Sequence, residues 1–170
     1  MSNYLVPGSA FSVRPLYIGQ YYKSTAQTLT NGNTDITFDL TSSWNNTGGF
    51  ITHANGTKDF TVVQPGLYQL DVSCLVLANG ATYTAAAIGK SLNIDITRSP
   101  SAEQSIIGNT AYQTTTQNYN MTLSGTFYLN GGDVINLRVG NTWTGGGPPT
   151  LAAVANTYDL NTFFTWTFLN

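Results

Sequence analysis

Charged side chains are scarce in this sequence. Only 8% of its 170 residues are Asp, Glu, Lys or Arg, whereas an average soluble protein has about 25%. Glu103 is the only Glu, and Lys23, Lys58 and Lys90 are the only Lys residues. Because Glu and Lys cover the surfaces of most helices, their scarcity argues against a helical protein and favours an all-β one.

The few basic residues are also scattered. Arg14, Arg98 and Arg138 stand far apart, no two basic residues are adjacent, and the formal net charge is -2. A nucleic-acid binder needs clustered cations to displace counterions from phosphates, and a binder of anionic lipid needs a polybasic segment. The sequence therefore predicts no nucleic-acid partner and no electrostatic membrane patch.

Long hydrophobic runs are absent as well. No apolar stretch approaches the ~18 residues of a membrane span. Residues 1–20 contain no basic segment followed by an apolar one, so we expect no secretory signal peptide there. We therefore expect that the chain does not insert into a membrane.

Cysteine and histidine occur once each. Cys74 can form no intrachain disulfide, and its place in an apolar alternation favours a buried core thiol. His53 would have to serve any Ser-His-Asp or Cys-His arrangement, and no nucleophile elbow surrounds it. It lies beside a turn, which favours an exposed or loosely packed side chain. We therefore expect no enzyme, no catalytic residues, no cofactor and no histidine-based metal centre.

The carboxylates leave one metal-site alternative open. Asp35 and Asp39 are four residues apart, so in a strand they point to one face. Together with loop carbonyls, they could form a calcium site, because Ca²⁺ prefers oxygen ligands. The spacing of the other carboxylates singles out no pair for glycoside hydrolysis.

Alternation of apolar and polar residues runs through almost the whole chain. It predicts a single antiparallel jelly-roll β-sandwich of about eight to ten strands over residues 16–170, preceded by an N-terminal arm at 1–15. Gly125 interrupts one run and is a candidate bulge or close-approach site. Residues 78–89 are expected to form a loop. The apolar positions of the runs are Ile36, Phe38 and Leu40; Phe60 and Val62; Tyr68, Leu70, Val72, Cys74 and Val76; Leu92, Ile94 and Ile96; Tyr119, Met121, Leu123, Phe127 and Leu129; Ile135, Leu137 and Val139; and Phe164, Trp166 and Phe168.

Three segments, in order, resemble those of one known family. Residues 60–68 include Phe-Thr-Val followed by Pro-Gly-Leu-Tyr, residues 129–137 read Leu-Asn-Gly-Gly-Asp-Val-Ile-Asn-Leu, and residues 163–169 read Phe-Phe-Thr-Trp-Thr-Phe-Leu. They resemble strands of the globular head of the complement and tumour necrosis factor superfamily, over about residues 16–170. The resemblance implies a ten-strand jelly roll of two sheets that usually forms a compact trimer with a buried aromatic axis.

The composition adds a second resemblance. The Thr- and Asn-rich, charge-poor sequence, together with residues 136–139 and the loop at 143–145, is similar to the stand-alone jelly rolls of viral vertex, minor-capsid and spike proteins. This implies a non-enzymatic structural protein of a virion, with other virion proteins as partners. The alternative is a trimeric head displayed outside a cell or on a particle surface, where it binds a host receptor or a glycan.

The C-terminal run predicts self-assembly. Phe164, Trp166 and Phe168 can fill one face of a strand, while Phe163 and Leu169 fall on the other side or at its end. A strand that is apolar on both faces must be dry on both sides, and a second copy of the chain is the simplest cover. We expect a homo-oligomer, a trimer or else a pentamer, with Phe163 or Leu169 near the shared axis. The expected interface residues are Phe163, Trp166, Leu169, Tyr21 and Tyr22.

Overall fold

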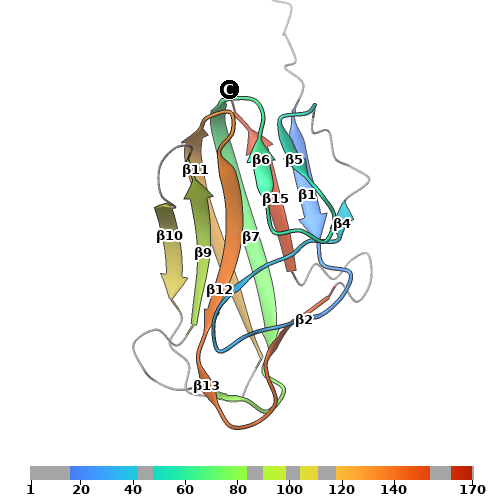
Figure 1. Cartoon of the computed structure of the whole chain (residues 1–170), viewed down its shortest axis with the longest axis vertical. Helices are drawn as coiled ribbons and strands as arrows, with labels where there is room; N and C mark the ends of the chain where they lie inside the picture. Colours follow the sequence, from blue (N-terminus) through green and yellow to red (C-terminus); the bar gives the residue numbers. More distant parts are fainter. Residues whose placement is uncertain are drawn as a thin grey trace, which may run out of the picture.

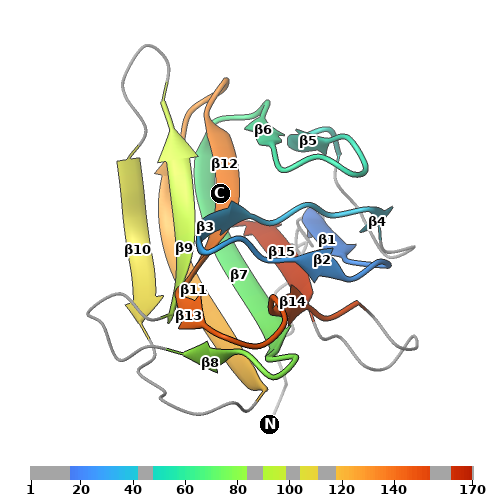
Figure 2. The same cartoon turned by 60° about the horizontal axis from the view of Figure 1, so that its bottom comes forward.

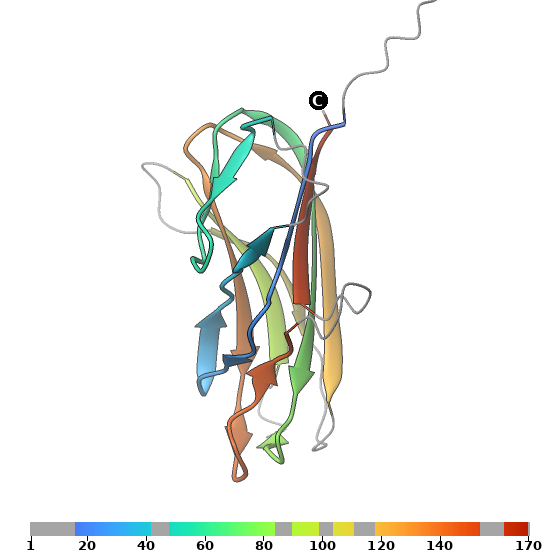
Figure 3. The same cartoon turned by 90° about the vertical axis from the view of Figure 1, so that its right-hand side faces the viewer.

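The described part of the chain is built entirely from strands and their connections. The computed structural model describes residues 16–41, 48–83, 90–98, 104–110, 118–153 and 162–169, and none of these is helical. Two curved antiparallel sheets face each other as the layers of a sandwich (Figures 1 and 3). The expected all-β jelly roll is confirmed. The expected arm at 1–15 lies outside the described residues.

The first sheet contains the two longest of the described strands. Its order is β2-β14-β7-β15-β1-β4, and β11 pairs with the free side of β7. Its strands are β1 (Ile18–Tyr22), β2 (Gln27–Thr28), β4 (Leu40–Thr41), β7 (Gly66–Leu77), β11 (Tyr119–Leu129), β14 (Thr150–Leu151) and β15 (Thr162–Phe168). The four neighbouring strands β11, β7, β15 and β1 form one broad layer, seen side-on in Figure 3.

The second sheet lies opposite. Its order is β10-β9-β12-β6-β5, with β3 paired to another part of β12. Its strands are β3 (Gly32–Asp35), β5 (Ile51–His53), β6 (Phe60–Val62), β9 (Lys90–Thr97), β10 (Gln104–Thr110) and β12 (Val134–Asn141). A separate pair, β8 (Thr82–Tyr83) with β13 (Trp143–Thr144), lies at one end of the sandwich (Figure 2).

The core follows from the alternation. In β7, every second residue from Tyr68 to Val76 is at most 2% exposed, and the apolar positions of β6, β9 and β12 are equally buried. Each fully buried large apolar side chain contributes roughly 1.5–3 kcal/mol. Leu40 departs from this pattern: β3 ends before Ile36, and Leu40 lies in the separate strand β4, where it is 45% exposed.

A glycine explains how the largest core side chain fits. Gly19 of β1 lies directly opposite Trp166 of β15. A Cβ at position 19 would overlap the indole ring of Trp166, so a side chain there would force that ring to move. Trp166 is fully buried and packs edge-on to Tyr68, with ring centroids 6.0 Å apart. The close approach therefore requires glycine inside a strand.

Two local expectations need correction. Gly125 forms no bulge, because the pairing of β11 with β7 is continuous from Tyr119 to Leu129. The described irregularity lies instead in β10, between Ser105 and Ile107. The segment 78–89, expected to be a loop, contains the short strand β8, and residues 84–89 lie outside the described part.

Candidate functional site

The single histidine and the single cysteine are both structural. His53 is stacked on Phe60, with ring centroids 4.1 Å apart, and meets Tyr21 edge-on at 5.0 Å. Its Nδ1 lies 3.0 Å from the carbonyl oxygen of Asp59, and its Nε2 lies 3.1 Å from that of Phe38. His53 is half-buried, and two aromatic rings and two carbonyls contact its ring, so the expectation of an exposed or loosely packed histidine is wrong.

Cys74 is the buried core thiol that the alternation predicts. It is 0% exposed, and burial raises its pKa to about 12. A thiol with such a pKa is almost entirely protonated at neutral pH, so it is a poor nucleophile.

The calcium alternative is not supported by the positions of the two carboxylates. Asp35 forms ion pairs with Lys58 at 2.9 Å and with Arg138 at 3.1 Å, so cationic side chains already occupy its oxygens. Asp39 instead accepts hydrogen bonds from the backbone of Ser24 and the hydroxyl of Thr25. Within the described residues, no three His, Cys, Asp or Glu side chains gather as metal ligands would.

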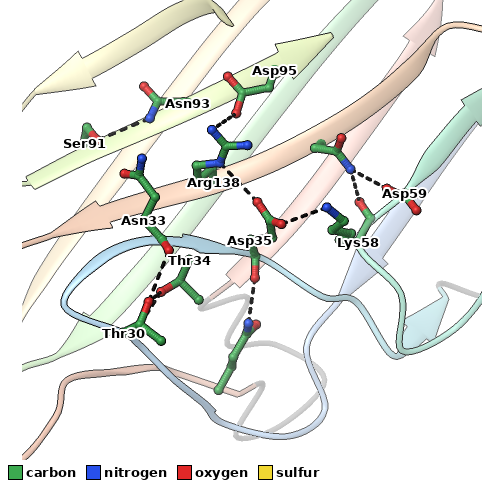
Figure 4. A network of polar contacts seen from close by, with 12 residues as sticks. Thr30, Asn33, Thr34, Asp35, Lys58, Asp59, Ser91, Asn93, Asp95 and Arg138 are labelled. Carbon is green, nitrogen blue, oxygen red and sulfur yellow. Dashed lines mark hydrogen bonds and ion pairs between the residues drawn. The ribbon is translucent and has the colours of Figure 1, made fainter. Parts of the chain in front are cut away.

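The solvent side of the second sheet carries a dense polar network (Figure 4). Arg138 lies between two carboxylates, 3.1 Å from Asp35 and 3.3 Å from Asp95. Burial by itself raises the pKa of Asp35, but the hydrogen bonds and charges of Lys58 and Arg138 outweigh burial, and the pKa lies below its usual value. Beside this group, Asn136 donates to Asp59 at 2.7 Å. These contacts all form within a single chain.

The solvent side of the first sheet is different. We call the outward-facing side chains of β1, β15, β7 and β11 the outer face. Asp71 is the only charged residue in these four strands. Cross-strand pairing arranges the outer face in rows, each of which takes one residue from every strand. The rows differ in polarity along the strands.

The middle of the outer face is polar. The Asp71 carboxylate accepts from the Ser124 hydroxyl at 2.6 Å and from the Gln69 amide at 3.1 Å. The Thr126 hydroxyl donates to Gln69 at 2.6 Å. We call these four residues the polar centre. Because their hydrogen bonds are made to one another, a second protein could cover them without leaving many polar groups unpaired.

Next to the polar centre lies an apolar groove. It has a volume of about 590 Å³ and is lined by Asp71, Val72, Ser73, Thr122, Leu123, Ser124 and Phe163. Phe163 lies between Ser73 on one side and Tyr22 on the other, and Tyr22 in turn pairs with Leu40 of β4. We call this the Phe163 groove. A large apolar ring facing solvent at the wall of a groove is typical of an interaction surface.

At the opposite end of the outer face lies a row of exposed apolar side chains. Leu67 of β7 pairs with Tyr128 of β11, and the amide of Leu169 donates to the carbonyl of Leu67 at 2.8 Å. Leu16 precedes β1 by two residues and extends the row past Leu169. The exposed fractions are 61% for Leu16, 47% for Leu169, 37% for Leu67 and 60% for Tyr128. We call these four residues the end row.

The five expected interface residues fall into two groups. Tyr21 and Trp166 are 4% and 0% exposed in the single chain, so their side chains belong to its core and could reach a partner only if the sandwich opened. Tyr22, Phe163 and Leu169 face solvent on the outer face, and Tyr22 is the direct partner of Phe163. The interface itself stays a prediction, since a single chain does not test it.

Several outer-face residues were not foreseen. Leu67 and Tyr128 are apolar residues at positions where the alternation of their strands requires polar ones. That mismatch is a readable signal of a second apolar surface. Leu40 was assigned to the core instead, and Leu16 lies outside any predicted run. The described residues contain no helix that could cross a membrane.

The comparison with known proteins shows the fold. No family model and no curated protein sequence matches the chain. Solved structures of murine APRIL align over 91% of this chain and 100% of theirs, with TM-scores of 0.59 and 0.60 and 11% identity. The structure of Eiger TNF from S. frugiperda aligns over 92% of this chain and 94% of its own, with a TM-score of 0.56 and 15% identity. The chain therefore has a tumour necrosis factor-like jelly-roll fold, as its motifs predicted.

Proposed function

We propose that this chain is a non-enzymatic, self-assembling head in which copies meet through the Phe163 groove. The observation that carries the proposal is the composition of the outer face. Its four adjacent strands contain a single charged residue, and Phe163 lines a groove on it. In a solvent-facing sheet, charged side chains normally occupy these positions. Their scarcity lowers the desolvation cost of covering the face with protein.

Tyr22, Phe163 and Leu40 supply the driving force. They lie side by side across β1, β15 and β4 and remain partly or fully exposed in the single chain. Covering apolar surface contributes roughly 25 cal/mol per Å². Homo-oligomers usually close with cyclic symmetry, so the same groove meets the neighbouring copy each time. The resemblance to tumour necrosis factor-like heads favours a trimer, with a pentamer as the second choice.

The finer assignment is a structural protein of a virion, at a vertex, in the minor capsid or on a spike. It is supported by the charge-poor, Thr- and Asn-rich composition and by the resemblance to stand-alone viral jelly rolls. Its partners would be further copies and other virion proteins. Electron microscopy of particles containing this chain would test it: fivefold rings support a vertex protein, isolated trimers support a spike or a receptor- or glycan-binding head, and absence from particles would refute the virion assignment.

Sedimentation velocity at micromolar concentration tests assembly. We expect the wild-type chain to sediment as a homo-oligomer and Phe163→Ser to shift it toward monomer, with a dissociation constant raised at least about tenfold. Val63→Ser is the matched control, because Val63 is 47% exposed but lies outside the four strands. Circular dichroism should show the same β signal in all three. A well-folded, purely monomeric wild-type chain would refute the proposal.

A further inference from the structure

The end row is a second apolar surface, separate from the Phe163 groove. Its member on β7, Leu67, is four residues from Asp71, the nearest residue of that strand that lines the groove. Four residues of a strand span roughly 13 Å. The polar Gln69, which bonds to Asp71, lies between them. The two surfaces therefore need not have the same occupant.

The end row contains most of the large apolar exposure of the described chain. Of the six exposed large hydrophobic residues there, four are in the end row; the other two are Leu40 and Val63. The row crosses four strands, and three strand spacings of about 4.8 Å give a width of roughly 14 Å. About five residues of extended chain would cover it. Figure 1 places the C-terminus at this same end of the sandwich.

The chemistry of residues 1–15 matches this surface. The segment contains Tyr4, Leu5 and Val6 in succession, then Phe11 and Val13 alternating with Ser12, and Arg14 is its only charged side chain. An alternation of this kind suits an extended chain with one apolar side. Fifteen extended residues reach up to about 50 Å, several times the width of the row.

The segment's point of attachment favours docking on another copy. The segment joins the described chain at Leu16, which is itself in the end row. Proline at position 15 fixes its own φ near -65° and biases Arg14 toward extended backbone. A reversal onto the segment's own row would have to begin at these two residues. Extended backbone at these two residues, which the proline favours, would lead the segment away from its own row and toward a neighbour.

We propose that residues 1–15 of one copy dock on the end row of a neighbouring copy and thereby tie the assembly together. This rests on the proposed self-assembly. Phe11 and Val13 supply the apolar contacts with Leu67, Leu169 and Tyr128. The interaction needs no charge complementarity, because neither the end row nor residues 1–13 carry a charged side chain.

Disulfide trapping in the full-length chain tests the proposal. One population carries Ser9→Cys, which lies on the same side of an extended segment as Phe11 and Val13. A second carries Thr126→Cys, which faces outward two residues from Tyr128 and leaves the row intact. Cys74 is buried and does not compete. After mixing and mild oxidation, we expect a disulfide-linked dimer of the two variants. Adding Leu67→Ser to the Thr126→Cys chain should lower its yield about fivefold to tenfold.

The control pairs Ser9→Cys with Thr52→Cys, an exposed position in β5 of the second sheet. A yield no higher than this control, or a yield insensitive to Leu67→Ser, would overturn the inference. So would a link formed only within single chains of a double variant, Ser9→Cys/Thr126→Cys, because that shows docking in the same chain. Sedimentation of the same samples separates the two proposals: an assembled protein without the link refutes only the segment docking, whereas a monomeric protein refutes both.

Discussion

The two sheets of the sandwich turn opposite kinds of surface to their surroundings. On the second sheet, Arg138 joins Asp35 and Asp95, and Lys58 reaches Asp35 from the neighbouring hairpin (Figure 4). On the first sheet, Asp71 is the only charged residue of the four central strands. Both faces carry polar contacts between side chains, but those of the first sheet are hydrogen bonds of hydroxyls, amides and the Asp71 carboxylate, and none described there is an ion pair.

The difference indicates which face can be buried. Desolvating ion pairs is costly, so the second sheet is stable facing water and would resist a partner that covered it. The outer face has hydrogen bonds without ion pairs and rows of exposed apolar side chains. Covering it with a partner therefore costs little desolvation energy and buries apolar surface. Of the two described sheet surfaces, the outer face is therefore the one that is poor in charge, and this favours its burial against another copy.

Among the changes that test this difference between the sheets, replacing Arg138 should cause the largest loss in the free energy of unfolding. Asp95 is 1% exposed, and Arg138 is the cation that faces it at 3.3 Å. Arg138→Met would leave a buried carboxylate without that charge. We expect a loss of about 3–5 kcal/mol in the free energy of unfolding, measured by urea denaturation at fixed protein concentration.

The control for Arg138→Met is the double variant Arg138→Met/Asp95→Leu. Removing both charges should restore much of the lost stability, because no uncompensated charge remains. Asp35 keeps Lys58 as a partner in both variants. A loss below about 1 kcal/mol in the single variant would mean that water or another group compensates the Asp95 carboxylate, and that the second face is less dependent on its ion pairs than we infer.

The sequence predicted the core well because burial follows a local rule. Alternation in β7, β9 and β12 has a period of two, and each period places one residue inside and one outside. Strand β1 was not predicted, because Gly19 occupies the position where an apolar residue would have completed the alternation with Tyr21. Its glycine is explained only by Trp166, which comes from the far end of the chain.

The polar network could not be predicted in the same way. Asp35 and Arg138 are 103 residues apart, and they meet only because β3 pairs with β12 in one particular register. Local spacing instead grouped Asp35 with Asp39, which the fold sends to different partners. On the outer face, Phe163, Tyr22 and Leu169 were among the expected interface residues. Grouping Leu169 with Leu16, Leu67 and Tyr128 in the end row required knowing that β1, β15, β7 and β11 are neighbours.

Replacing Lys90 should cause the second-largest change in the free energy of unfolding. Its charge lies on neither of the two solvent-facing surfaces. It is 0% exposed on the core side of β9, and its Nζ lies 3.9 Å from the centre of the Tyr119 ring. Burial lowers its pKa from the ordinary 10.5 to about 8. Between these values the folded chain binds fewer protons than the unfolded chain, so this group makes stability rise with pH, and its cost is fully present below about pH 8.

We therefore expect Lys90→Met to stabilise the chain at pH 7 by roughly 1–3 kcal/mol and to flatten the rise in stability between pH 8 and 10. Urea unfolding of both proteins at pH 7, 8, 9 and 10 measures the difference. Lys23, whose pKa is also lowered by burial, is unchanged in both proteins and cancels. A destabilised variant with the wild-type pH profile would show that the ammonium is held by favourable contacts rather than tolerated.

Asp71→Asn should have the smallest effect on the fold and sharpens the comparison most directly. An asparagine oxygen can still accept from Ser124 and Gln69, so we expect the unfolding free energy to stay within about 0.5 kcal/mol of wild type. Assembly should respond differently, because Asp71 lines the groove where copies are proposed to meet and its charge must then lose water. Sedimentation equilibrium should show a dissociation constant lowered about threefold to tenfold.

Asp35→Asn is the matched change on the second sheet, and it should weaken the fold without strengthening assembly, because it removes the partner of two cations. If Asp71→Asn weakens assembly instead, the carboxylate makes a favourable contact with a partner. Assembly would then depend on this charge and not on the scarcity of charge on the outer face.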